Sequence, residues 1–295
     1  MAAEYARPRA TLLVTDLDNT LWDWFKAWHA SFSALLFRVC EMSGIPQRQL
    51  ESEIQAVHRR RGTSEYAYLL NELPSLRDKH TKTKPSVVYD DAIHAFNRAR
   101  QRNTNLYPGV ETTLHELQRR NIPVVAYTES ISYWSEWRIK QTRLDGVIKV
   151  LYSSPDHDFP TGITPESLRT RPASWYGLRE TVHKRVPPGV LKPNTEVLRS
   201  ILEDFSAIPK ETVYVGDSLM KDVAMAQEVG VQDVHALYGV VQHHDGYDLL
   251  RRVSHWTDAD IRREKELSSR SSVCASYTLT KDFSELLTMF EFRGH

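Results

Sequence analysis

The sequence contains very little cysteine. Cys40 and Cys274 are its only cysteines, they lie far apart in the chain, and neither belongs to a CxxC pattern. A disulfide framework or a thiolate zinc site requires several cysteines at short spacings. The sequence therefore predicts two ordinary thiols and excludes both of these classes of site.

Net charge and long apolar runs are also absent. Lysine plus arginine and aspartate plus glutamate each total 38, so no global field attracts nucleic acid or an anionic membrane. No apolar run approaches the roughly 20 residues that span a bilayer. We therefore expect a cytosolic protein without nucleic-acid or membrane partners, and no pattern in the sequence indicates an oligomeric state.

Short apolar runs that end abruptly in polar residues recur along the chain. They occupy residues 11–15, 122–127, 147–152 and 212–215, and shorter ones follow at 233–238 and 277–280. Apolar residues at helical spacing separate them, for example within residues 110–117 and 197–205. Because strands alternate with helices, the sequence predicts an α/β fold, a Rossmann-like parallel sheet flanked by helices.

Two stretches interrupt this alternation. Residues 22–104 contain no convincing strand and consist of charged helical segments, so we expect an inserted helical subdomain. Residues 155–189 are rich in proline and arginine and indicate an irregular insertion. We therefore predict a discontinuous core, residues 1–21 and 105–295, which carries both insertions.

Polar residues follow several of the predicted strands directly. Asp16 and Asp18 follow the first strand, Thr128 follows the second, and Asp217 follows the fourth with Asp222 shortly behind it. The carboxyl ends of parallel strands meet at one edge of a sheet, so these side chains should converge. Carboxylates that converge repel one another unless a cation lies between them, and their oxygens suit Mg²⁺. The sequence therefore predicts a magnesium site at this edge.

Four short motifs span the sheet-forming part of the chain. DLDNTL begins at Asp16, Thr128 follows IPVVAY, Lys192 precedes a proline, and GDSLMKD occupies residues 216–222. In order and spacing they resemble the motifs of the haloacid dehalogenase (HAD) superfamily of hydrolases and phosphatases. Residues 22–104 resemble the helical cap that such enzymes insert after the first motif. The resemblance implies a phosphatase that acts on a small phosphorylated metabolite.

The resemblance also assigns roles to the motif residues. Asp16 is expected to attack phosphorus and form an aspartyl-phosphate, while Asp18 protonates the leaving alcohol and then activates water. Thr128 and Lys192 are expected to bind the phosphoryl oxygens. An aspartate at position 18 favours phosphate ester hydrolysis, because HAD dehalogenases and phosphonatases lack it. The implied Mg²⁺ ligands are Asp16, the backbone carbonyl of Asp18, Asp217 and Asp222.

Other interpretations of these residues remain open. A phosphotransferase or phosphomutase would use the same aspartyl-phosphate, and a non-catalytic interaction module would use only the scaffold. Thr128 and Ser218 also suit helix caps, and Lys192 also suits a surface position ahead of a helix that begins at Pro193. We interpret Thr128 and Lys192 as functional and Lys221 as a surface residue.

Two basic stretches have alternative interpretations as well. The run HRRRG at residues 58–62 either contacts a second anionic group of the substrate through Arg59, Arg60 or Arg61, or is a solvated helix end, which we favour. The irregular insertion either forms an anion-binding flap or is a solvated loop. The basic residues of this candidate flap are Arg169, Arg171, Arg179, Lys184 and Arg185.

Overall fold

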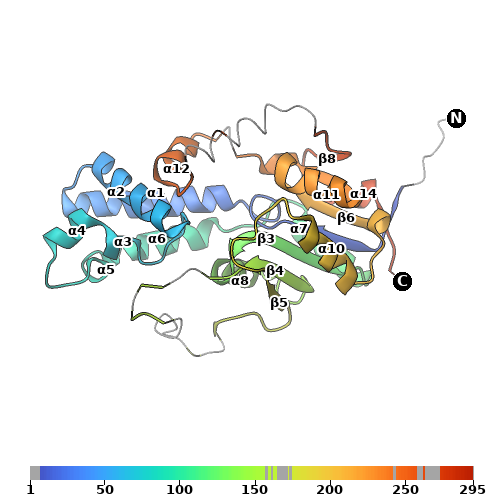
Figure 1. The fold of residues 1–295 in the computed structure, drawn as a ribbon, viewed down its shortest axis with the longest axis horizontal. Coiled ribbons are helices and arrows are strands. Elements are labelled where there is room, and N and C mark those ends of the chain that lie inside the picture. The colour runs from blue at the N-terminus through green and yellow to red at the C-terminus, as the bar shows by residue number, and fades with distance from the viewer. Residues whose placement is uncertain are drawn as a thin grey trace. The chain divides into compact units, whose positions relative to one another are not determined.

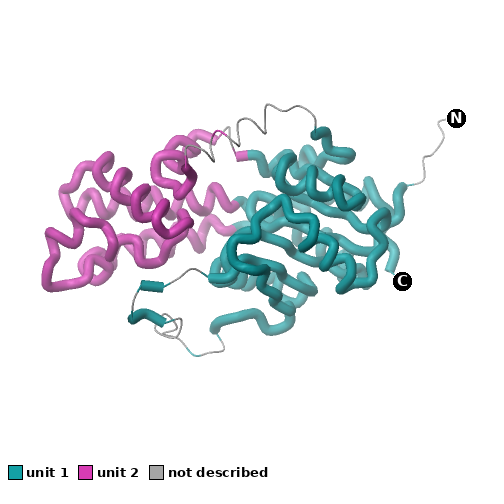
Figure 2. Tube along the Cα trace, in the orientation of Figure 1, with its two compact units in different colours: residues 1–23, 105–240, 270–295 teal, residues 24–104, 241–269 magenta. Residues whose placement is uncertain are grey.

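The computed structural model describes residues 7–156, 159–160, 162–164, 172, 175–241, 244–257, 262 and 273–294. The chain forms two compact units (Figure 2). The sheet unit comprises residues 1–23, 105–240 and 270–295, and the helical unit comprises residues 24–104 and 241–269. Among the described helices, none is both long enough and apolar enough to cross a membrane.

The sheet unit is built on one parallel sheet (Figure 1). Among the described residues this sheet has seven strands in the order β5-β4-β3-β2-β6-β7-β8. The strands are β2 (Leu12–Thr15), β3 (Val124–Ile131), β4 (Val150–Ser154), β5 (Val182–Arg185), β6 (Thr212–Gly216), β7 (Gln232–Ala236) and β8 (Tyr277–Leu279). A separate short pair joins β1 (Arg9–Ala10) to β9 (Glu291–Phe292). The strand order changes direction at β2, which is the position where open α/β sheets bind ligands.

Helices flank this sheet. They are α7 (Val110–Arg119), α8 (Ser132–Gln141), α10 (Thr195–Asp204), α11 (Ala224–Val229) and α14 (Leu286–Met289), with tighter or wider turns at η2 (Pro209–Glu211), η3 (Leu219–Val223), η4 (Leu237–Gly239) and η5 (Phe283–Glu285). On one face, Val14 and Tyr214 of the sheet pack with Leu198 of α10 and Met225 of α11. From β2, the strands β3 and β4 follow towards one edge of the sheet, and β6 and β7 lie towards the other edge. Crossovers between parallel strands are right-handed, so α7 and α8, which lead to β3 and β4, lie on the opposite face from α10 and α11. The predicted Rossmann-like α/β fold is confirmed.

The predicted irregular insertion contains a strand that its sequence pattern did not indicate. β5 pairs in parallel with β4 at the edge of the sheet. Its sequence, VHKR, has no apolar run because the strand is largely exposed. His183 anchors β5, since its Nε2 lies 2.8 Å from Oγ of Ser153 in β4 and its Nδ1 lies 2.7 Å from Oε1 of Glu136 in α8. These contacts hold the edge strand against β4 and α8. Ser153 is fully buried, so its hydroxyl is not accessible to a substrate although a histidine and a glutamate lie beside it.

The candidate flap is only partly described. Lys184 Nζ lies 2.6 Å from Oδ2 of Asp204, and Arg185 Nε donates a hydrogen bond to Ser132 Oγ at 3.1 Å. These two basic side chains are therefore engaged by residues of the sheet unit itself. Arg169 and Arg171 lie outside the described residues.

The helical unit has its own apolar core. Its helices are α1 (Trp24–Ser43), α2 (Gln47–Arg61), α3 (Leu69–Glu72), α4 (Pro74–Lys79), α5 (Pro85–Val88), α6 (Asp90–Asn103) and α12 (Tyr247–Val253). Trp28 and Phe32 of α1 pack with Leu50 and Ile54 of α2 in this core. All residues of this buried apolar cluster come from the helical unit, so the unit has a core of its own.

The basic run at the end of α2 is involved in ion pairs. Arg60 Nη2 lies 2.7 Å from Oε2 of Glu72, and Arg61 pairs with the other oxygen of the same carboxylate. Burial acts to raise the pKa of Glu72, but hydrogen bonds from Arg61, Tyr66 and Arg60 outweigh it and lower the pKa to about 2. Arg60 and Arg61 therefore stabilise the α2–α3 connection.

α12 belongs to the helical unit, although the sequence placed all of residues 105–295 in the core. Leu250 and Val253 are buried in the apolar cluster of the helical unit. Arg252 Nε donates to Oε2 of Glu51 at 2.8 Å, and His58 Nδ1 lies 2.6 Å from the carbonyl oxygen of Val253. The sequence does not indicate that α12 belongs to the helical unit, because a helix of seven residues with two buried apolar side chains could pack on any apolar surface.

Candidate active site

Strand β2 delivers Asp16 to the carboxyl edge of the sheet. The strand is completely buried, and the backbone N–H of Asp16 donates to the carbonyl of Val215 in β6 at 2.8 Å. The chain then turns sharply through Asn19, which has a positive φ of 58°. Thr20 Oγ1 lies 3.5 Å from Oδ2 of Asp16, at the limit of a hydrogen bond. The backbone of Asp16 is therefore held against β6, and one oxygen of its carboxylate lies beside the hydroxyl of Thr20 in the following turn.

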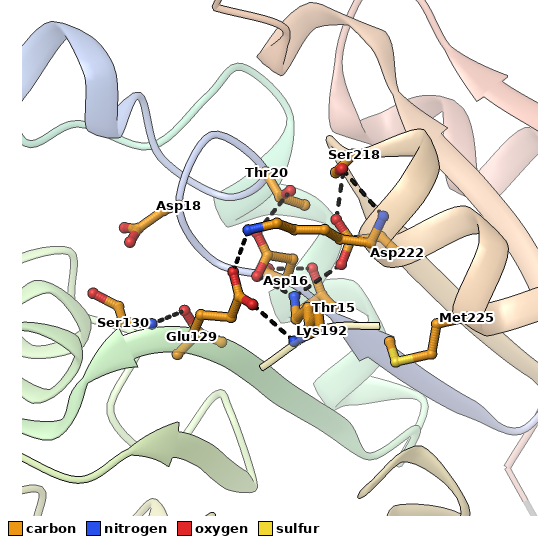
Figure 3. Close-up of polar contacts among 12 residues, drawn as sticks. Thr15, Asp16, Asp18, Thr20, Glu129, Ser130, Lys192, Ser218, Asp222 and Met225 are labelled. Carbon is orange, nitrogen blue, oxygen red and sulfur yellow. Dashed lines mark hydrogen bonds and ion pairs between the residues drawn. The ribbon is translucent and has the colours of Figure 1, made fainter. Parts of the chain in front are cut away.

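A buried ammonium group joins two carboxylates at this edge (Figure 3). Lys192 Nζ lies 2.6 Å from Oδ1 of Asp16 and 2.8 Å from Oδ1 of Asp222. The same ammonium lies 5.1 Å from the ring centre of Tyr127 and 5.7 Å from that of Tyr214. Burial disfavours the charged form, but Asp16 and Asp222 outweigh this effect and raise the pKa of Lys192 well above its usual value. Lys192 therefore carries a positive charge in the site.

Asp217 completes a group of three carboxylates. Ligand oxygens of Asp16, Asp217 and Asp222 all lie within 4.8 Å of one another. Asp222 is held from both sides, since its Oδ1 accepts a hydrogen bond from Tyr214 at 2.9 Å and its Oδ2 accepts one from the N–H of Ser218 at 3.1 Å. This arrangement of oxygen atoms could hold a metal ion, because hard cations prefer carboxylate ligands.

Burial and mutual repulsion perturb these carboxyl groups. Burial raises the pKa of Asp16 to about 7; Asp222 and Asp18 add to the shift, while Lys192 opposes it. Burial, together with Asp16 and Asp222, raises the pKa of Asp217 well above its usual range. One lysine thus compensates only part of the negative charge that the three aspartates bring together.

The remaining motif residues surround this group. Thr128 lies within β3, which continues to Ile131, beyond the predicted strand end at Tyr127. Its Oγ1 accepts a hydrogen bond from the N–H of Ser130 at 3.1 Å. The carboxylate of Asp18 points away from Asp16 (Figure 3), so the structure does not bring it into the cluster. Ser218 caps η3, because its Oγ accepts a hydrogen bond from the N–H of Lys221 at 3.2 Å.

Glu129 is a site residue that the sequence reasoning missed. Its Oε1 accepts a hydrogen bond from the N–H of Lys192 at 2.7 Å, and its Oε2 lies 2.5 Å from Nζ of Lys221. Lys221 is partly exposed, as predicted, but it is also paired with a residue of the site. The position of Glu129 directly after Thr128 was the available signal, although a glutamate after a strand is common on surfaces.

Two glycines allow the loops of the site to approach one another. A Cβ on Gly216 would lie 2.2 Å from Cγ of Asp222, and a Cβ on Gly239 would lie 1.8 Å from the carbonyl oxygen of Asn19. Distances this short are not tolerated, and in the second case the obstacle is backbone. Gly239 therefore allows the turn after Asp16 to pack against η4, a contact that no pattern in the sequence indicates.

Comparison with known proteins identifies the family. A model of haloacid dehalogenase-like hydrolases matches residues 10–230, so the chain belongs to this family of hydrolases. The structure is similar to that of a HAD phosphatase from Thermococcus onnurineus, with 15% identity, 95% of this chain and 97% of that chain covered, and a TM-score of 0.52. It is also similar to 2-haloacid dehalogenase from Pseudomonas syringae pv. Tomato DC3000, with 16% identity, the same coverage and a TM-score of 0.51. At such identities the likeness shows the fold alone. No curated protein matches the sequence significantly.

The raised pKa of Asp16 predicts how the stability of the metal-free protein depends on pH. A group with a raised folded-state pKa stabilises the fold fully below its unfolded pKa, here 3.8, and this contribution is lost as the pH rises through the folded value of about 7. Asp16→Asn removes the ionisation. In EDTA, the melting temperature of this variant relative to wild type should therefore increase from about pH 4 to about pH 7. A difference that is constant or that decreases with pH would contradict the assignment.

The close approach at Gly239 predicts a strong effect of a single methyl group. Gly239→Ala should destabilise the protein by roughly 1–3 kcal/mol, because either the turn at Asn19 or η4 must move. Leu237→Ala is the matched control in the same turn, and its exposed side chain predicts a change within about 0.5 kcal/mol. Urea unfolding of the three proteins measures both values. Equal stability of the Gly239 variant and wild type would show that the loops are not in contact.

Proposed function

We propose that this hydrolase is a Mg²⁺-dependent phosphatase that hydrolyses a small phosphate monoester through an aspartyl-phosphate on Asp16. The observation that carries the proposal is the 2.6 Å contact between Lys192 Nζ and Asp16 Oδ1. It fixes a positive charge beside the proposed nucleophile, where the oxygens of a transferring phosphoryl group need compensation. Asp18 supports phosphate esters over haloacids as substrates, because it supplies an acid for an alkoxide leaving group.

The donor set suits a divalent cation. Burial and the repulsion between neighbouring carboxylates raise the pKa values of Asp16 and Asp217, and a bound cation would relieve the repulsion. Asp16, Asp217 and the carbonyl of Asp18 would hold Mg²⁺, and Asp222, which already accepts hydrogen bonds from Tyr214 and Ser218, would support it directly or through water. When bound, Mg²⁺ would neutralise negative charge on the phosphoryl group.

The first half of the proposed reaction transfers the phosphoryl group to the protein. A carboxylate oxygen of Asp16 attacks phosphorus, and the bond between phosphorus and the leaving oxygen breaks. Asp18 gives its proton to that oxygen, which leaves as an alcohol. Lys192 and the hydroxyl of Thr128 stabilise the phosphoryl oxygens throughout, and Lys192 keeps its proton.

The second half releases phosphate. The ionised Asp18 takes a proton from water, and the water oxygen attacks phosphorus. The bond between phosphorus and Asp16 breaks, so inorganic phosphate leaves and both aspartates return to their starting states. A phosphotransferase would use an alcohol in place of this water, and product analysis separates the two reactions.

Asp16→Asn tests the nucleophile. The change keeps the volume of the side chain but removes its nucleophilic charge, so hydrolysis of p-nitrophenyl phosphate and of a panel of sugar, nucleotide and glycolate phosphates should fall roughly a hundredfold or more. Asp248→Asn, an exposed change in α12, is the control and should retain wild-type rates. The release of inorganic phosphate is the measurement. Activity of the Asp16 variant above about a tenth of wild type would exclude the covalent mechanism.

Metal removal tests the cofactor. Dialysis against EDTA should abolish phosphate release, and Mg²⁺ should restore it. Ca²⁺ should compete with Mg²⁺ and inhibit, because its larger and more flexible coordination shell does not keep the nucleophile in line with the leaving oxygen. Asp217→Ala should raise the Mg²⁺ concentration needed for half-maximal activity or abolish activity. Full activity in EDTA would refute the assignment of Mg²⁺.

A further inference from the structure

The carboxylate of Asp18 lies in a defined environment outside the Asp16 cluster (Figure 3). Its Oδ1 accepts a hydrogen bond from Nε1 of Trp22 at 2.6 Å. The same oxygen lies 3.4 Å from Nη1 of Arg138, which comes from helix α8. One oxygen of the proposed acid and base is therefore held by an indole N–H and a guanidinium group from different parts of the sheet unit.

Arg138 is a buried charge. Its side chain is 3% exposed, against 21% for Asp18. A guanidinium group is always ionised in proteins, and its burial requires a compensating charge and hydrogen bonds. Asp18 places its Oδ1 beside this buried charge. Because a buried guanidinium is planar and rigid, the pair fixes direction as well as charge.

Arg138 also connects Asp18 to the last part of β3. Its Nη1 donates a hydrogen bond to Oγ of Ser130 at 3.1 Å. The N–H of Ser130 in turn donates to Oγ1 of Thr128 at 3.1 Å. The chain of contacts therefore runs from a proposed phosphate-binding residue, through Arg138, to the proposed acid and base.

We propose that Arg138 is a positioning residue for the reaction, which acts through Asp18 and fixes the orientation of its carboxylate with the help of Trp22. The effect on catalysis rests on the proposed function, in which Asp18 transfers the proton; the orientation of Asp18 by Arg138 does not. Arg138 need not touch the substrate. Without the guanidinium group, Asp18 would keep its chemistry but lose one of the contacts that direct it, and proton transfer is sensitive to such misplacement.

The first test measures the position of Asp18 without any assay of activity. The sequence has seven tryptophans, and the indole N–H signal of Trp22 in a ¹⁵N spectrum is assigned with the Trp22→Phe variant. Arg138→Met should shift or broaden this signal, and Arg138→Lys should restore it in part. Lys140→Met, which removes a cation from the same helix, should leave it in place. An unchanged Trp22 signal in a folded Arg138→Met protein would overturn the proposal.

The second test is a double-mutant cycle on p-nitrophenyl phosphate and a sugar phosphate. Arg138→Met should lower kcat for the sugar phosphate roughly 10- to 100-fold, with little change in KM, because its leaving group needs the oriented acid. In an Asp18→Asn background the same change should cost less than about twofold. Equal losses in both backgrounds would assign Arg138 a purely structural role. If the Trp22 signal responds as expected but the wild-type protein hydrolyses no phosphate ester, the proposed function fails while the positioning of Asp18 by Arg138 stands.

Discussion

The buried ammonium of Lys192 is the contact on which the site depends. It links Asp16, which directly follows β2, to Asp222 in η3. Burying charged groups is costly unless they are paired, and this lysine pairs with both aspartates. The contact also leaves a charge imbalance, since the three aspartates exceed the single ammonium. A bound cation would reduce that imbalance. Burial raises the pKa of Asp16 to about 7, and repulsion from Asp222 and Asp18 adds to the shift.

The sequence predicts those parts of the fold whose physical cause is local. Completely buried strands such as β2 and β6 are short apolar runs, and in a parallel sheet each run ends at the same edge. The approach of Asp16 and Asp217 follows from that geometry, and η3 then brings Asp222 to the same edge. The sequence does not indicate β5, because an exposed edge strand needs no apolar run. It does not indicate where α12 packs, because the partners of Leu250 and Val253 lie far away in the chain.

Other parts of the site depend on contacts between distant residues and leave no local signal. Arg138 is one of many arginines in the sequence, and its burial beside Asp18 results from the path of α8. Gly239 follows an ordinary strand, and its need for glycine arises only where Asn19 approaches. Glu129 acts through two lysines that lie far along the chain. Motif matching finds the groups that perform chemistry, whereas the groups that orient them emerge from the three-dimensional packing.

The helical unit is formed by two separate stretches of the chain, so it cannot be removed by a single deletion. The chain passes between the units at residues 23/24, 104/105, 240/241 and 269/270. A deletion of residues 24–104 alone would remove α2 and leave Leu250 and Val253 of α12 without the apolar surface that buries them. Such a protein would expose the apolar side chains of α12 to solvent, which favours aggregation. A clean excision requires two linkers, one for each stretch, and a graft of the helical unit onto another sheet must likewise carry both.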